Sequence, residues 1–174
     1  MCGFVGVASI KNQSSRAWLG NGNNEMIHRG PDSHGVWWSE DGRVGMAHRR
    51  LSILDLSNSA NQPMHNADQA LSIVFNVEIY NVSQLRVNLE TKGYKFLTSS
   101  DTEVLLASYS EWGEDCLRHL NGMFAFAIYD AKREVVFLAR DRAGEKPFFY
   151  HYLNGVLHFS SELKALFLAP TLKK

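Results

Sequence analysis

The run from Met123 to Tyr129 constrains the fold most, because every one of its residues is apolar. A short apolar run of this kind is typical of a β-strand that is covered on both faces. The chain offers many partners for such a strand, and the Asn-Gly pair at 154–155 is a strong signal for a tight hairpin between two of them. We expect these further strands at residues 4–10, 35–38, 44–48, 71–75, 94–96, 134–139, 148–152 and 156–159.

The main helices are expected between two groups of strands. Leu85 and Leu89 share one face of a helix over residues 82–92, which Gly93 ends. The residues from Ser99 to Glu103 can cap a second helix that runs to about Trp112. Short helices are predicted at 25–28, 114–120 and 160–167, and residues 12–25 predict no element. The order predicts two stacked antiparallel sheets with helices outside, an α+β fold.

Composition excludes several classes of function. The 174 residues predict a single domain, 1–174, with a sizeable core, and 18 basic against 18 acidic residues argue against a nucleic-acid partner. No apolar run approaches the roughly 20 residues of a membrane span, and no signal peptide is recognisable, so we expect no membrane partner and a cytoplasmic location. Cys2 and Cys116 lie far apart and the histidines lack ligand spacing, so neither a disulfide nor a metal site is predicted. Cys116 is expected on an apolar helix face as a small hydrophobe.

Cys2 follows the initiator methionine directly. A small second residue generally permits removal of Met1, which would leave Cys2 with a thiol and a free α-amine. The ordinary pKa of an α-amine is about 7.7–8.0, so the amine can accept the thiol proton near neutral pH. Nucleophile and base would then belong to one residue, as in hydrolases with an N-terminal threonine. Taken alone, Cys2 is better interpreted as an ordinary residue at a frayed chain end, and only the other motifs reverse this preference.

Other polar residues have both a structural and a functional interpretation. Adjacent arginines such as Arg49 and Arg50 are usually solvated charge, but a guanidinium in a pocket binds a carboxylate bidentately. Asp101 taken alone is best interpreted as a helix N-cap. The segment 29–32 has the composition of a turn. Residues 55–68 predict a long ordered loop of a kind that is often functional.

Together these residues resemble a known family, the class II glutamine amidotransferase domains of glutamine-hydrolysing asparagine synthetases, which are N-terminal nucleophile hydrolases. The resemblance implies a four-layer αββα sandwich of two antiparallel sheets, in agreement with the predicted elements. The matching stretches occur in the same order as in the family and extend over nearly the whole chain. They are residues 1–3, Arg29-Gly30-Pro31-Asp32, 47–55, Gln62-Pro63-Met64, 75–81, 100–104, 122–127, 140–147 and 159–165.

The resemblance implies a role for each site residue in the hydrolysis of L-glutamine to glutamate and ammonia. Cys2 would attack the side-chain amide, while the side-chain NH₂ of Asn76 and the N–H of Val77 would stabilise the oxyanion. Arg50 would bind the substrate carboxylate, with help from the backbone at Ser52 and Ile53. Glu78 and Asp101 would bind the substrate ammonium. Arg29 and Asp32 would order the Cys2 end of the chain.

Two features qualify this assignment. Val77 replaces the glycine that the family usually has, and a valine at positive φ would cost on the order of 1–3 kcal/mol in strain. We therefore hypothesise that Val77 weakens glutamine hydrolysis. Met1 must also be removed, because its peptide bond would otherwise occupy the amine of Cys2.

The resemblance also implies a partner. Family members carry an ATP-dependent synthetase domain marked by a Ser-Gly-Gly-x-Asp-Ser loop, which is absent from this sequence. No cofactor is expected in this domain, and ATP and Mg²⁺ are expected only in a synthetase domain, in the same or another chain, that accepts the ammonia. Three hypotheses remain: a glutaminase domain, a related hydrolase that acts on another amide, and a catalytically weakened or inactive binding or regulatory module.

Overall fold

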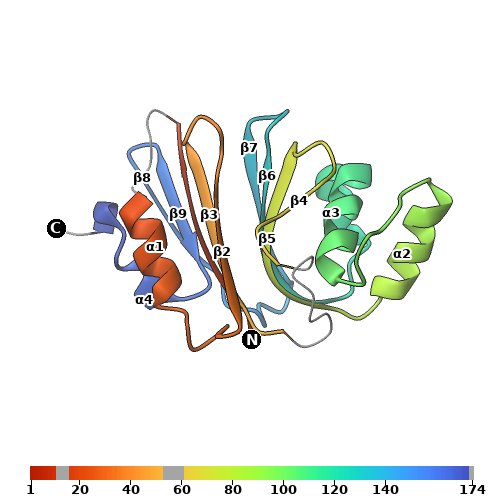
Figure 1. Cartoon of the computed structure of the whole chain (residues 1–174), viewed down its shortest axis with the longest axis horizontal. Helices are drawn as coiled ribbons and strands as arrows, with labels where there is room; N and C mark the ends of the chain where they lie inside the picture. The colour runs from red at the N-terminus through yellow and green to blue at the C-terminus, as the bar shows by residue number, and fades with distance from the viewer. Residues whose placement is uncertain (11–15, 53–60, 173–174) are drawn as a thin grey trace.

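The structure is a computed structural model that describes residues 1–10, 16–52 and 61–172. It is a four-layer αββα sandwich (Figure 1). Two antiparallel sheets pack face to face, with α1 and α4 outside one and α2 and α3 outside the other. The strands are β1 (Gly3–Ser9), β2 (Ser33–Trp38), β3 (Val44–Arg50), β4 (Met64–His65), β5 (Leu71–Ile79), β6 (Gly122–Asp130), β7 (Val135–Arg140), β8 (Phe149–Leu153) and β9 (Val156–Ser160). The helices are α1 (Arg16–Asn24), α2 (Val82–Thr91), α3 (Asp101–Trp112), α4 (Leu163–Leu166) and the 3₁₀ helices η2 (Gly113–Arg118) and η3 (Pro170–Leu172).

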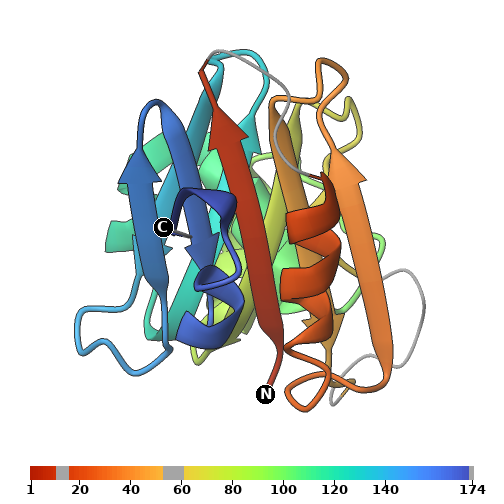
Figure 2. The ribbon, with the colours of Figure 1, turned by 90° about the vertical axis from the view of Figure 1, so that its left-hand side faces the viewer.

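The first sheet has the strand order β2-β3-β1-β9-β8 and holds the start of the chain at its centre. Gly3 pairs with Arg49 and Val5 pairs with Ser160, so β1 is bonded on both edges. Figure 2 shows β1 in the middle of this sheet, with α1 and α4 lying across its outer face. A central strand is held more firmly than an edge strand, so the residue before Gly3 starts from a fixed position.

The second sheet has the order β4-β5-β6-β7. The apolar run that dominates the sequence forms β6, which pairs with β5 and β7 on either side. Its side chains alternate between two hydrophobic cores, as the period of two requires. Phe124, Phe126 and Ile128 face the helices, whereas Ala125 and Ala127 face the other sheet.

Three hydrophobic clusters fill the spaces between the four layers. The middle cluster, between the sheets, contains Phe4, Met46, Val74 and Phe159. Gly6 makes room for it, because a Cβ at this position would lie 2.1 Å from the Phe159 ring. The even-numbered residues of β1 therefore face the other sheet, and Cys2 belongs to the same face.

Most predicted elements are confirmed, and four predictions are wrong. Strand β4 forms at Met64–His65, inside the segment 55–68 that was predicted to be a loop, and residues 55–60 of that segment lie outside the described residues. Helix α1 forms where no element was expected, the predicted helix at 25–28 is a turn that follows it, and 94–96 form no strand. Tertiary contacts explain α1, because Trp18 and Leu19 are buried against the first sheet despite the polar composition around them. Cys116 is buried among apolar side chains, as predicted, and burial raises the pKa of its thiol to about 12. None of the described helices has both the length and the hydropathy needed to cross a membrane.

Candidate active site

Cys2 lies at the end of the cleft between the two sheets, just before β1. Its Sγ is 3.4 Å from the backbone N of Leu51, whose N–H can donate to the sulfur. The Arg29 guanidinium holds the same residue from the other side, with Nε donating to the Cys2 carbonyl at 2.9 Å and Nη1 paired with Glu162 at 3.1 Å. Gly30, the residue after Arg29, packs directly on the backbone of β3, because a Cβ at this position would lie 2.4 Å from the carbonyl carbon of Arg49.

The two adjacent arginines at the end of β3 have opposite surroundings. Arg49 faces α1, where it donates to the Asn23 carbonyl at 3.1 Å and to Asn24 Oδ1 at 2.6 Å. Arg50 faces the cleft and donates from Nη1 to Asn61 Oδ1 at 2.8 Å. Because successive residues of a strand point to opposite faces, only the second arginine can contact a molecule in the cleft.

Strand β5 forms the wall opposite Cys2 and presents a row of backbone N–H groups along its outer edge. The Phe75 N–H donates to Gln62 Oε1 at 2.6 Å, and the Ile79 N–H donates to Asp101 Oδ2 at 3.3 Å. Val77 lies between Phe75 and Ile79 and is paired with Phe124 of β6. Phe124 uses both its N–H and its carbonyl to bond Asp141 on the β7 side. Val77 and Phe124 are therefore a non-hydrogen-bonded pair, and the Val77 N–H points away from β6 toward the cavity edge.

Asn76 supplies a second donor at the same place. Its side chain is 3% exposed, and its Nδ2 is a buried atom without a hydrogen-bond partner among the described residues. Such groups are rare in folded proteins, because an unsatisfied buried donor costs roughly 1–3 kcal/mol. An unpaired amide at the edge of a cavity is suited to bind an oxygen of a ligand.

Val77 does not carry the backbone strain that its replacement of glycine could have produced. Positive φ among the described non-glycine residues occurs only at Gln69, Glu134 and Asn154. Val77 is part of β5, and its half-buried side chain packs against the core between the sheet and the helices. The conformational argument for a weakened or inactive module is therefore removed.

The acidic residues lie at the far end of the same cavity. Asp101 is the first residue of α3, and the N-cap is Ser100, whose hydroxyl accepts from the Glu103 N–H. Burial raises the pKa of the Asp101 carboxyl, and the nearby Glu78 carboxylate raises it further. A cation placed between the two side chains would favour the charged form of Asp101, against the burial and the neighbouring carboxylate that raise its pKa.

These groups line one cavity of about 270 Å³, which suits a small polar molecule. Its described lining consists of Met1, Cys2, Arg50, Leu51, Gln62, Phe75, Asn76, Val77, Glu78, Ser100, Asp101, Thr102 and Lys146. Met1 is 60% exposed. Ser52 lies beside the cavity with its N–H donated to Asp32 Oδ2 at 2.8 Å, and Ile53 lies outside the described residues.

Several lining or supporting residues were assigned no role in the site from the sequence, among them Asn61, Gln62 and Lys146. Gln62 and Lys146 are buried at the cavity wall, and Asn61 contacts Arg50. Gln62 belongs to a motif that the sequence singled out, but nothing local indicated which groups its amide would meet. Lys146 also lies in a stretch that matches the family, 140–147, although no role was attached to it. Asn61 had no signal of its own.

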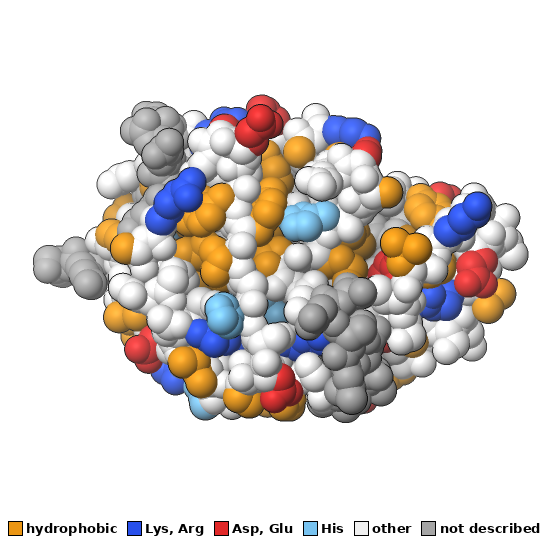
Figure 3. Space-filling view, in the orientation of Figure 1, with side chains coloured by type: hydrophobic (Ala, Val, Ile, Leu, Met, Phe, Trp, Pro, Cys, Tyr) orange, Lys and Arg blue, Asp and Glu red, His pale blue; other side chains and the backbone are white. Residues whose placement is uncertain are grey.

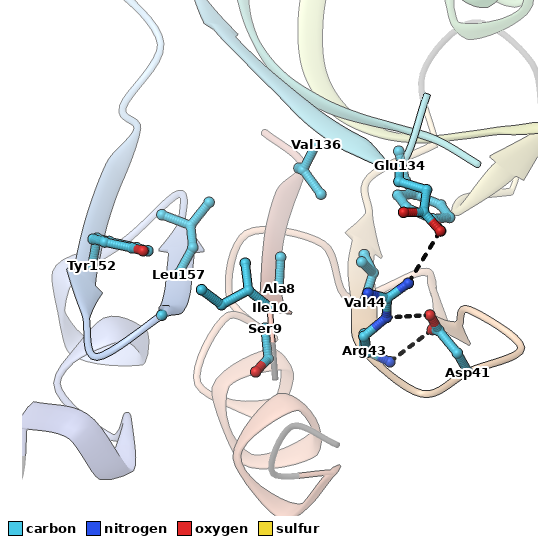
Figure 4. A pocket seen from close by; sticks show the side chains of 12 residues that line it. Ala8, Ser9, Ile10, Asp41, Arg43, Val44, Glu134, Val136, Tyr152 and Leu157 are labelled. Atoms are coloured by element: carbon cyan, nitrogen blue, oxygen red, sulfur yellow. Dashed lines mark hydrogen bonds and ion pairs between the residues drawn. The ribbon is translucent and has the colours of Figure 1, made fainter. Parts of the chain in front are cut away.

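A second cavity, of about 370 Å³, opens at the opposite end of the cleft. The charged side chains of this cavity form ion pairs with one another, since Arg43 pairs with Asp41 and with Glu134 (Figure 4).

In the space-filling view, hydrophobic side chains form a central group over the layer between the sheets (Figure 3). We place the candidate site at the Cys2 end, where a nucleophile, unpaired donors and charged groups converge.

The fold and the site together define a class of protein. A cysteine just before a central strand, between two stacked antiparallel sheets with helices outside, is the arrangement of an N-terminal nucleophile hydrolase fold. The sequence profile of the glutamine amidotransferase domain matches residues 1–174. The chain belongs to the glutamine amidotransferase domain family.

Curated relatives are considerably longer than this chain. An asparagine synthetase (glutamine-hydrolysing) 3 of Bacillus subtilis is 42% identical over 99% of this chain and 28% of its own length. Asparagine synthetase B (glutamine-hydrolysing) of Escherichia coli is 40% identical over 95% of this chain and 30% of its own length. The chain thus spans less than a third of these relatives.

Solved structures support the fold. A glutamine phosphoribosylpyrophosphate amidotransferase from B. subtilis superposes with a TM-score of 0.81 at 22% identity, over 96% of this chain and 43% of that one. An allosteric regulatory enzyme of purine biosynthesis superposes with a TM-score of 0.83 at 21% identity, with the same coverage. At this identity the likeness concerns the sandwich itself.

Proposed function

We propose that this chain hydrolyses L-glutamine to L-glutamate and ammonia, with Cys2 as the nucleophile. The observation that carries the proposal is the convergence on one cavity of the Cys2 thiol, the unpaired Asn76 amide and charged groups of both signs. Free glutamine offers a carboxylate, an ammonium and a side-chain amide, and each has a complementary group in the cavity.

Substrate binding follows from the charges. The Arg50 guanidinium binds the α-carboxylate by charge-assisted hydrogen bonds. Glu78 and Asp101 bind the α-ammonium, whose positive charge opposes the burial and the carboxylate repulsion that raise the pKa of Asp101. The side-chain amide then extends toward Cys2 and the edge of β5.

The chemistry begins after Met1 is removed, which frees the α-amine of Cys2. The amine accepts the thiol proton, and the sulfur attacks the amide carbon to form a tetrahedral oxyanion. The Asn76 Nδ2–H and the Val77 N–H stabilise this oxyanion, and losing one such donor typically costs about 2.7–4 kcal/mol of barrier. The protonated amine gives its proton to the leaving nitrogen, so ammonia departs and a thioester remains. Water then attacks the thioester, releases glutamate and restores the thiol.

The ammonia has a natural acceptor in the longer relatives. We propose that an ATP-dependent synthetase domain, in the same or another chain, uses the ammonia for asparagine synthesis or a similar amidation. ATP and Mg²⁺ would serve that domain, while the hydrolysis described above needs only the thiol, its amine and water. The cytoplasm is the compartment we propose, because the reactive thiol must stay reduced.

The proposal is tested with 6-diazo-5-oxo-norleucine, an electrophile that mimics glutamine. We expect one adduct on Cys2 by intact-mass spectrometry, slowed by added glutamine, together with glutamate release that Cys2→Ala abolishes. The same spectrum reports whether Met1 has been removed.

Two outcomes would contradict it. A chain that has lost Met1 but neither reacts with the probe nor releases glutamate would be a binding or regulatory module. Hydrolysis of a different amide in preference to glutamine would indicate a related hydrolase.

A further inference from the structure

Gln62 makes two hydrogen bonds across the wall of the cavity. It is 6% exposed, and its Oε1 accepts from the Phe75 N–H at 2.6 Å. Its Nε2 donates to the Thr102 hydroxyl at 3.3 Å. A single buried amide thus joins strand β5 to the first turn of α3.

The two partners of Gln62 are sequence neighbours of two site residues. Phe75 directly precedes Asn76, and Thr102 directly follows Asp101. The side chain of Gln62 therefore fixes the oxyanion donors relative to the carboxylate that binds the ammonium. By accepting the Phe75 N–H it also leaves the Val77 N–H as the next donor along the edge of β5.

Asn61 acts on the other end of the cavity. Its Oδ1 accepts from Arg50 Nη1 at 2.8 Å and from the Ser33 hydroxyl at 3.0 Å. An amide oxygen orients the guanidinium and, being uncharged, adds no negative charge beside it. A carboxylate in the same place would compete with the substrate for Arg50.

We propose that Asn61 and Gln62 are positioning residues with separate tasks. Asn61 holds Arg50 for the α-carboxylate, and Gln62 sets the spacing between the oxyanion donors and Asp101. This inference rests on the proposed glutaminase activity and assigns residues to which that proposal gives no role.

The two tasks predict different kinetic signatures. Without Asn61 the guanidinium is less well oriented for the ground state, so KM rises while kcat is kept. Without Gln62 both the oxyanion donors and Asp101 lose their support, so kcat falls and KM rises. Thr102→Val removes only the link from Gln62 to α3 and should raise KM alone.

The experiment measures glutamate release by the chain and its variants, normalised to the fraction of Cys2 that the diazo probe can titrate. A folding defect lowers that fraction, whereas a positioning defect changes the constants per titrated site. For Gln62→Met we expect kcat to fall on the order of tenfold, and for Asn61→Ala we expect KM to rise on the order of tenfold with kcat unchanged. Asn61→Asp should raise KM at least as much as Asn61→Ala, because its charge occupies Arg50.

The outcomes separate the two proposals. An unaltered chain that releases no glutamate overturns the proposed function and this inference with it. An active chain whose Gln62→Met variant keeps its kcat per titrated site overturns the inference alone, as does an Asn61→Asp variant with normal KM. If Gln62→Met does not fold, the nearly isosteric Thr102→Val decides, and an unchanged KM in that variant contradicts the role of Gln62.

Discussion

What a single residue can contribute to this cavity depends on whether its backbone or its side-chain groups point into it. Val77 contributes its N–H whatever its side chain, because the register with Phe124 turns that N–H away from β6. The side chain itself packs against the outer core. Replacement of the usual glycine therefore leaves the donor in place.

The first prediction concerns Val77→Gly. With no positive φ to relieve, we expect kcat/KM for glutamine to stay within about twofold of the unaltered chain, and the free energy of unfolding to fall by about 0.5–1 kcal/mol because glycine weakens a strand. Steady-state kinetics and urea unfolding measure the two quantities. A rise in kcat/KM well beyond twofold would show that the valine side chain obstructs the substrate.

At the scale of elements, the start of α3 is the part of the site with the most dedicated local support. Ser100 caps the helix, and the Glu103 carboxylate accepts from the N–H groups of Leu97 and Thr98. This network holds Asp101 in the first turn, where its carboxylate reaches the Ile79 N–H. Capping thus fixes Asp101, the proposed ammonium-binding residue, as well as a helix end.

The second prediction concerns this cap. Ser100→Ala should lower the free energy of unfolding by about 1 kcal/mol. It should also raise KM for glutamine, because Asp101 loses its fixed position. Ser110→Ala, an exposed change near the end of the same helix, is the matched control and should stay within about 0.5 kcal/mol. A cap variant with an unchanged KM would separate helix stability from substrate binding.

At the scale of the whole molecule, His48 links the two sheets behind the active site. It lies on β3, is fully buried, and its Nε2 is 3.0 Å from the carbonyl oxygen of Phe75 on β5. Because that carbonyl can only accept, Nε2 carries the proton. Burial, together with the nearby Arg50 charge, lowers the pKa of His48 to about 3. The two walls of the cavity are thus joined by a neutral histidine.

The third prediction is a pH dependence of stability. The unfolded chain protonates His48 near pH 6.5 and the folded chain only near pH 3, so the folded state loses stability as the pH falls between these values. One such histidine changes the free energy of unfolding by at most about 1.4 kcal/mol per pH unit. Burial lowers the pKa of His158 to about 4, which adds a slope of the same sign.

His48→Gln should therefore reduce the slope of unfolding free energy against pH by about one proton between pH 6 and 4.5. Urea unfolding at several pH values measures it, and His34→Gln on the exposed side of β2 controls for the loss of a histidine as such. An unchanged slope in His48→Gln would mean that other groups are responsible.

Much of the architecture could be predicted from local patterns. The apolar run of β6, the hairpin at Asn154-Gly155 and the capping residues before α3 each depend on neighbours in the chain, and each formed where expected. Helix α1 was missed because its polar sequence becomes helical through the burial of Trp18 and Leu19 against the first sheet. A contact of that kind leaves no periodic signal.

The sequence by itself determined most of the strands, the main helices and the residue types needed for an amide hydrolase, since these follow from side-chain period and from the order of motifs. Only the tertiary structure decided that Arg50 faces the cavity while Arg49 faces α1, that the Val77 N–H lies at an open strand edge, and that Asn61 and Gln62 reach their partners. Those facts depend on the register between segments that are distant in the chain. Register is fixed by how complete layers pack against each other, and no local stretch encodes it.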